Sequence, residues 1–188
     1  MRFHFTPTPF RCALPAIAVA AALAGDASGA ALPAPPRPTR DIPASIVSVA
    51  RAEFDKGIRE SPMGSDNSKA IARYRRALDP RPHGGPWCAY FASWVTRRAG
   101  APLGPRGSGM ASAAGIRAWA VRTGHWRHLP RPGDVAVFSH HVGIVVYVAG
   151  SRMTTIDGNW SNRVSRVPRR RREAIGFARV AVGDHPIR

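Results

Sequence analysis

Four residues that can carry hydrolytic chemistry follow one another along the 188-residue chain: Cys88, His141, Asp157 and Asn159. A cysteine nucleophile needs a histidine that takes and returns a proton, and a polar group that orients the imidazole ring. The order cysteine, histidine, then acid or amide supplies one candidate for each of the first two roles and two for the third. Each residue also has an ordinary structural explanation, which the surrounding sequence must outweigh.

Cys88 stands where a helix is expected to begin. The turn-forming Gly84-Gly85-Pro86 precedes an apolar stretch, and Trp87 and Phe91 share one helical face of it. The first helical turn carries unpaired N–H donors and partial positive charge, which stabilise a thiolate and can bind the oxyanion of a tetrahedral intermediate. The alternative is a buried, inert cysteine, and the local sequence fits both equally.

His141 opens a predicted strand over residues 141–148. Alternation places His141, Gly143 and Val145 on one strand face. A glycine two residues from a catalytic histidine leaves room for substrate or for the helix that carries the cysteine. For a histidine without context, an ordinary position at a strand end is the more frequent explanation.

Asp157 and Asn159 flank Gly158 at the end of the next predicted strand, 153–157. They share one strand face, so either can reach an imidazole on a neighbouring strand. An Asp-Gly-Asn tripeptide is also a common turn. The residues alone leave open which of the two is the third member of the site.

Helical periodicity precedes strand periodicity along the chain, which predicts an α+β fold. Ser68 is expected to cap the second helix. Helices are expected over residues 44–58, 68–78, 87–99 and 111–122, and strands over residues 134–138, 141–148, 153–157, 163–167 and 175–180. Short turns join the strands, so we expect a largely antiparallel meander of about five strands.

Residues 1–30 have the features of a signal peptide. Arg2 and Arg11 precede or border an alanine-rich apolar stretch, and Ser28-Gly29-Ala30 offers small residues for cleavage. The apolar stretch is short for a membrane span, although an uncleaved anchor is the alternative. The protein is therefore expected to be exported, to a periplasm or to the outside of the cell.

Residues 31–43 form a proline-rich spacer, and residues 44–188 are expected to form one domain. Cleavage of the signal peptide would remove Cys12 and leave Cys88 unpaired. A leftover cysteine in an exported protein is a reactive thiol or an interchain partner. We expect the protein to be a monomer.

A formal net charge of +17 attracts the chain to polyanions. The run Arg169-Arg170-Arg171-Arg172 lies between two predicted strands and is a candidate site for anionic cell-wall polymers or lipid headgroups, with a solvated loop as the alternative. No nucleic-acid-binding motif accompanies the charge, so no nucleic-acid partner is expected. The histidines and the remaining cysteine lack zinc-binding spacing, and neither a metal nor a cofactor is expected.

Separated blocks of the sequence carry a family resemblance. They are Trp87-Cys88-Ala89-Tyr90-Phe91, the run from Pro132 to Phe138, His141-Val142-Gly143-Ile144-Val145 and Ile156-Asp157-Gly158-Asn159, with Gly57 to Pro62, Asn67 and Tyr74 upstream. Together they resemble the CHAP family of cysteine, histidine-dependent amidohydrolases and peptidases of bacterial cell walls. The resemblance spans roughly residues 46–180.

The resemblance implies a papain-like fold in which the cysteine-bearing helix packs on an antiparallel sheet. It implies that Cys88 is the nucleophile and His141 the general base and acid. Asp157 matches the orienting carboxylate, which is more often Glu in the family, and Asn159 matches a further polar position. Some phage members bind calcium through acidic residues before the cysteine, but here only Asp79 is present, so no such site is expected.

The implied activity is hydrolysis of amide bonds in peptidoglycan by a cysteine peptidase or amidase. Cleavage within the stem peptide would make the protein an endopeptidase, and cleavage between stem peptide and glycan would make it an N-acetylmuramoyl-L-alanine amidase. The alternative is a non-catalytic basic module that binds cell-wall polymers or other polyanions.

Overall fold

The computed structural model describes residues 41–79 and 84–180, and every structural statement below concerns these residues. The predicted signal peptide and most of the predicted spacer lie outside them. The helices are α1 (Ile42–Asp55), α2 (Lys69–Arg76), α3 (Cys88–Arg98) and α4 (Ala113–Arg122), and the strands are β1 (Trp126–Arg127), β2 (Val135–Val137), β3 (Val142–Ala149), β4 (Arg152–Trp160), β5 (Arg163–Arg170) and β6 (Gly176–Ala178). Short 3-10 turns cover Pro105–Gly107 and Arg171–Glu173.

Three of the four helices in the described part begin with a side-chain cap. Asp41 accepts a hydrogen bond from the Ala44 amide in α1, so this helix starts two residues before the predicted position. Ser68 caps α2 as predicted, and Ser112 caps α4. Helix α3 has no side-chain cap. None of the helices in the described residues has the length and apolar character needed to cross a lipid bilayer.

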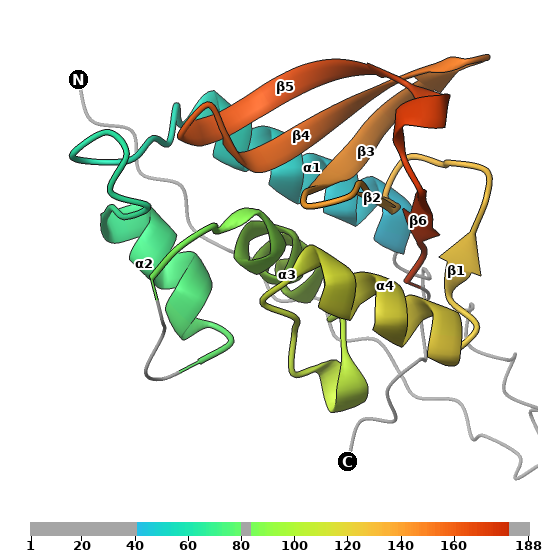
Figure 1. Cartoon of the computed structure of the whole chain (residues 1–188), viewed down its shortest axis with the longest axis horizontal. Helices are drawn as coiled ribbons and strands as arrows, with labels where there is room; N and C mark the ends of the chain where they lie inside the picture. Colours follow the sequence, from blue (N-terminus) through green and yellow to red (C-terminus); the bar gives the residue numbers. More distant parts are fainter. Residues whose placement is uncertain (1–40, 80–83, 181–188) are drawn as a thin grey trace, which may run out of the picture. The chain divides into compact units, whose positions relative to one another are not determined.

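The strands form one antiparallel sheet in the order β1-β6-β2-β3-β4-β5 (Figure 1). The predicted α+β class is therefore confirmed, and β2 to β5 form the predicted meander. Two features differ from the prediction. The short strand β1 was not predicted, and β6 does not continue the meander but returns to lie between β1 and β2.

The two faces of the sheet are buried in different ways. One face packs on α1, α3 and α4, and its residues include Val135, Ile144 and Ile156. The other face carries a smaller apolar cluster of Ala136, Phe138, Val145, Met153 and Phe177. Because side chains alternate along a strand, neighbouring residues of β4 serve different faces.

Strand β4 runs past the predicted turn at Asp157-Gly158-Asn159 and ends at Trp160. The turn instead lies at Ser161 and Asn162, which both have left-handed backbones with φ of 55° and 61°. Two consecutive residues with positive φ form the tight hairpin turn that matches strand twist. A bulge between Asp157 and Trp160 interrupts the pairing of β4 with β5.

Helix α3 packs closely on β4 at Gly158. A Cβ atom at this position would lie 2.5 Å from Cβ of Phe91 and 2.9 Å from Cζ3 of Trp87, both of which are fully buried. Only glycine lets the helix lie this close to the strand, because any larger residue would overlap two rigid aromatic side chains.

The variant Gly158→Ala is therefore expected to lower the free energy of unfolding by about 1–3 kcal/mol, measured by urea denaturation. Gly84→Ala is the matched control, because a Cβ there meets nothing within 4 Å. The control should change stability by less than about 0.5 kcal/mol. Equal stabilities of the two variants would show that the helix does not depend on this contact.

Candidate active site

Cys88 is the first residue of α3 and is 4% exposed, with a free thiol. Its backbone N–H belongs to the helical turn whose donors have no acceptor within the helix. Because no side chain caps α3, these donors are not committed to a capping group. The predicted position of Cys88 at a helix N-terminus is confirmed.

Glu60 fixes the residue that precedes the cysteine. Its side chain is 2% exposed, and it accepts hydrogen bonds from Nε1 of Trp87 at 2.9 Å and from the Asp66 amide at 3.0 Å. The backbone of Glu60 is held in turn by the β4–β5 hairpin, through a 2.9 Å bond from its amide to the carbonyl of Asn162. Glu60 belongs to a block of the family resemblance, but its role could not be read from the sequence, because its partner lies 27 residues away.

His141 lies at the end of a tight turn rather than within a strand. The Phe138 amide donates to the His141 carbonyl at 2.8 Å, and β3 begins at the next residue. The imidazole ring is close to two aromatic rings, with centroid distances of 6.2 Å to Phe138 and 5.4 Å to Trp160. Its side chain is 18% exposed, so one part of the ring remains accessible to a substrate.

Asp157 is the acidic partner of His141. Nε2 of His141 lies 3.0 Å from Oδ2 of Asp157, whose side chain is fully buried. Ile144 pairs with Ile156 across β3 and β4, which places Gly143 opposite Asp157. A Cβ atom on Gly143 would lie 1.9 Å from Oδ1 of the carboxylate. The space at Gly143 is therefore filled by Asp157, and the expectation that it accommodates substrate or the cysteine helix is wrong.

Asn159 points elsewhere. The bulge gives it a left-handed backbone with φ of 60°, and its Nδ2 donates to Oδ1 of Asp66 at 3.2 Å. The expectation that Asp157 and Asn159 share a strand face fails because the bulge breaks the alternation between them. The structure thus brings Asp157 to the imidazole and uses Asn159 to tie β4 to the loop that contains Glu60.

Cys88 and Asp157 meet His141 from opposite sides of the sheet. Ile156 and Gly158 face α3, whereas Asp157 between them points toward the other face. Because His141 stands just before β3, at the end of the sheet, its ring contacts both groups. A chain of contacts from Cys88 through His141 to Asp157 results.

The charge of this site favours a protonated imidazole. Burial, the largest influence, disfavours the imidazolium, but hydrogen bonds and charge attraction from Asp157 and Cys88 outweigh it and raise the pKa of His141 from 6.5 to about 9. His141 is therefore a cation at neutral pH, beside a carboxylate and a cysteine sulfur. Within the described residues, no three histidine, cysteine, aspartate or glutamate side chains cluster as metal ligands.

Arg169 is a further member of the site that the sequence did not identify. The run Arg169 to Arg172 was expected to be a polymer-binding or solvated segment, but the Arg169 side chain is only 7% exposed and lies 2.5 Å from Oδ2 of Asp157. Strand β5 extends through Arg170 and turns the Arg169 side chain inward. Only Arg170, Arg171 and Arg172 of the run are exposed.

The contacts of His141 predict how its titration responds to mutation. Asp157→Asn removes the negative charge that stabilises the imidazolium, so the pKa of His141 should fall from about 9 toward 6.5. Asn159→Ala should leave it unchanged, because Asn159 contacts Asp66 instead. NMR titration of the histidine ring protons in both variants measures the difference. If the pKa of His141 fell further in the Asn159→Ala protein than in the Asp157→Asn protein, Asn159 would be the partner of the imidazole in solution.

Comparison with known proteins gives a similarity over the segment that contains the site. Residues 80–159, which include Cys88, His141, Asp157 and Asn159, match the family model described as the CHAP domain. No curated protein and no solved structure gives a significant match to the chain. The matched segment contains α3, the turn at His141 and strand β3, together with β4 as far as Asn159, and this part of the chain is therefore similar to the CHAP domain.

Proposed function

We propose that the protein is an exported peptidoglycan hydrolase that cleaves an amide bond with Cys88 as nucleophile. The observation that carries the proposal is the chain of contacts from Cys88 at the N-terminus of α3 through His141 to the buried Asp157. CHAP domains are amidohydrolase and peptidase domains, and residues 80–159 match that family. A cysteine beside an imidazolium that a carboxylate orients is the arrangement that nucleophilic thiol catalysis requires.

In the acylation step, the Cys88 thiolate attacks the carbonyl carbon of the amide and the carbonyl π electrons move to oxygen. The backbone N–H of Cys88 is available to stabilise this oxyanion. As the tetrahedral intermediate collapses, the C–N bond breaks and the His141 imidazolium gives its proton to the departing nitrogen. A thioester on Cys88 and a free amine result.

In the deacylation step, the neutral His141 ring takes a proton from water, and the resulting hydroxide attacks the thioester carbonyl. The C–S bond breaks, and the products are a carboxylic acid and the regenerated thiolate–imidazolium pair. Asp157 keeps the ring oriented through its contact with Nε2 of His141. The net reaction is hydrolysis of one amide bond by one water molecule.

A groove beside the site suits a peptide with small side chains. Phe138, which contacts His141, also borders a cavity of about 440 Å³ between α4 and the end of β2. Its walls are short or apolar side chains, among them Ala114, Ala118 and Ile175, and Arg117 and Arg122 also line it. The short side chains of the walls leave room for a stem peptide with small side chains such as alanine. The positive charges of Arg117 and Arg122 would attract its carboxylates.

The exposed arginines of the run, Arg170 to Arg172, add a second contact with the wall. We assign them to weak, salt-sensitive attraction toward anionic wall polymers, which keeps the enzyme near its substrate. Export through the predicted signal peptide would bring the enzyme to that substrate. The non-catalytic alternative would rest on these arginines alone and would leave the His141–Asp157 pair without a role.

The primary test compares the protein with its Cys88→Ala variant on purified sacculi. Release of soluble fragments should fall by about three orders of magnitude or more, because the nucleophile is lost. Mass spectrometry of the products identifies the bond. A new N-terminus within the peptide indicates an endopeptidase, and a free N-terminal alanine with intact glycan indicates an amidase. Equal release by both proteins would overturn the proposal.

The groove generates a separate prediction. Ala118→Phe fills the cavity from the exposed face of α4, so the KM for a soluble muropeptide should rise several-fold, with little change in the rate of Cys88 alkylation by iodoacetamide. Lys69→Gln, an exposed change on α2, is the control for a general effect of surface substitution. An unchanged KM would place the substrate elsewhere.

A further inference from the structure

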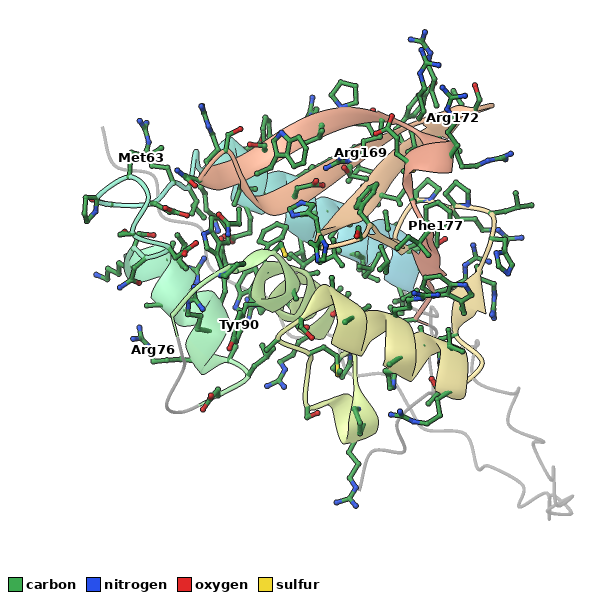
Figure 2. The ribbon with its side chains drawn as sticks, in the orientation of Figure 1. Met63, Arg76, Tyr90, Arg169, Arg172 and Phe177 are labelled. Atoms are coloured by element: carbon green, nitrogen blue, oxygen red, sulfur yellow. The ribbon has the colours of Figure 1, made fainter. Side chains whose placement is uncertain are left out.

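Arg169 differs from its neighbours in the arginine run. Its side chain is 7% exposed, whereas Arg170, Arg171 and Arg172 are exposed to solvent. Figure 2 shows Arg169 over the body of the sheet and Arg172 at its rim. Loss of hydration disfavours a buried guanidinium unless its partners compensate, so its contacts explain its position.

The guanidinium of Arg169 contacts four other side chains. Nη2 donates to Oδ2 of Asp157 at 2.5 Å, and Nε donates to Oγ1 of Thr155 at 3.3 Å. The Cζ atom lies 4.2 Å from the ring centroid of Phe138 and 4.3 Å from that of Trp160. Two cation–π contacts and an ion pair fix both the plane and the depth of the group.

These contacts coincide with those of His141. Oδ2 of Asp157 is the atom that both Nε2 of His141 and Nη2 of Arg169 contact. The rings of Phe138 and Trp160 border both cationic side chains. Oδ1 of Asp157 has no hydrogen-bond partner among the described groups, so the orientation of the carboxylate depends on Oδ2.

We propose that Arg169 is a positioning residue of the active site, which locks the Asp157 carboxylate in the orientation that holds His141 against Cys88. The role rests on the proposed function, since it concerns the same site. Arg169 does not touch the reacting atoms. Arg169 acts through Asp157. The rings of Phe138 and Trp160 contact both Arg169 and His141, so they also link the positions of these two side chains.

The charge of Arg169 has a measurable consequence. The charged groups around the imidazole are Asp157 from β4, Arg169 from β5 and Cys88 from α3, with the exposed His140 next in the chain. Removal of the one fixed cation makes the remaining groups bind protons more tightly. The pKa of His141 should therefore rise above about 9, and the pH dependence of Cys88 reactivity should move upward with it.

The test uses three variants of the whole protein: Arg169→Gln, Arg169→Lys and the control Arg76→Gln, which removes the same charge from an exposed site on α2. Two experiments are made on each variant. The first follows the rate of Cys88 alkylation by iodoacetamide as a function of pH, with mass spectrometry as the readout. The second measures kcat and KM on a soluble muropeptide. Circular dichroism establishes that each variant is folded.

We expect Arg169→Gln to lower kcat by about 10-fold or more with KM within about twofold, because orientation and not binding is lost. Its alkylation profile should move to higher pH. Arg169→Lys keeps the charge but not the planar fork, so its profile should stay near that of the unchanged protein while kcat remains reduced. Arg76→Gln should change neither the alkylation profile nor the kinetic constants.

Arg169→Gln and Arg76→Gln proteins with the same alkylation profile and the same kcat would overturn the inference. A folded Arg169→Gln protein with lower thermal stability but normal kcat and profile would make Arg169 a structural residue only, which also overturns it. If Arg169→Gln does not fold, the Arg169→Lys protein decides, since unchanged kcat there contradicts a positioning role. An unmodified protein that hydrolyses no peptidoglycan would refute the proposed function, while the alkylation profiles would still test Arg169.

Discussion

The site depends on one buried carboxylate oxygen. Nε2 of His141 and Nη2 of Arg169 both contact Oδ2 of Asp157, although the Asp157 side chain is fully buried. A buried carboxylate is unfavourable unless cations and donors compensate it, and here two cationic side chains converge on a single atom. Gly143 provides the space for the carboxylate, since a methyl group there would overlap Oδ1. The sheet is therefore built around this ionic contact rather than around apolar packing alone.

The nucleophile is positioned by a second, independent set of contacts. Gly158 lets α3 lie directly on β4, and Glu60 binds the indole of Trp87 immediately before Cys88. Gly158 lies in β4, and the amide of Glu60 donates to the carbonyl of Asn162 in the β4–β5 hairpin. The helix that carries Cys88 is therefore held against the same strand that carries Asp157. The imidazole of His141 links the two sets because it stands at the end of the sheet, where the two faces meet.

The chemically competent residue types and their order could be read from the sequence, and so could most of the elements. Helix periodicity, the cap at Ser68 and the alternation in β2 and β3 are local signals, which depend on neighbours a few residues apart. The position of β6 beside β2 could not be read, because pairing between distant strands leaves no local pattern. The bulge after Asp157 was missed for the same reason, and it decided between Asp157 and Asn159.

Sequence by itself determined the class of chemistry, a cysteine at a helix start followed by a histidine and an acid, and the α+β order of elements. Only the tertiary structure decided which polar side chain meets the imidazole and which side chain fills the space beside Gly143. It also turned Arg169, which sits in a run of four arginines that looks uniform along the chain, into a buried partner of Asp157. The reason is physical: the burial and the partner of a charged side chain depend on strand register and on contacts across many residues, and neither is encoded in the residue type.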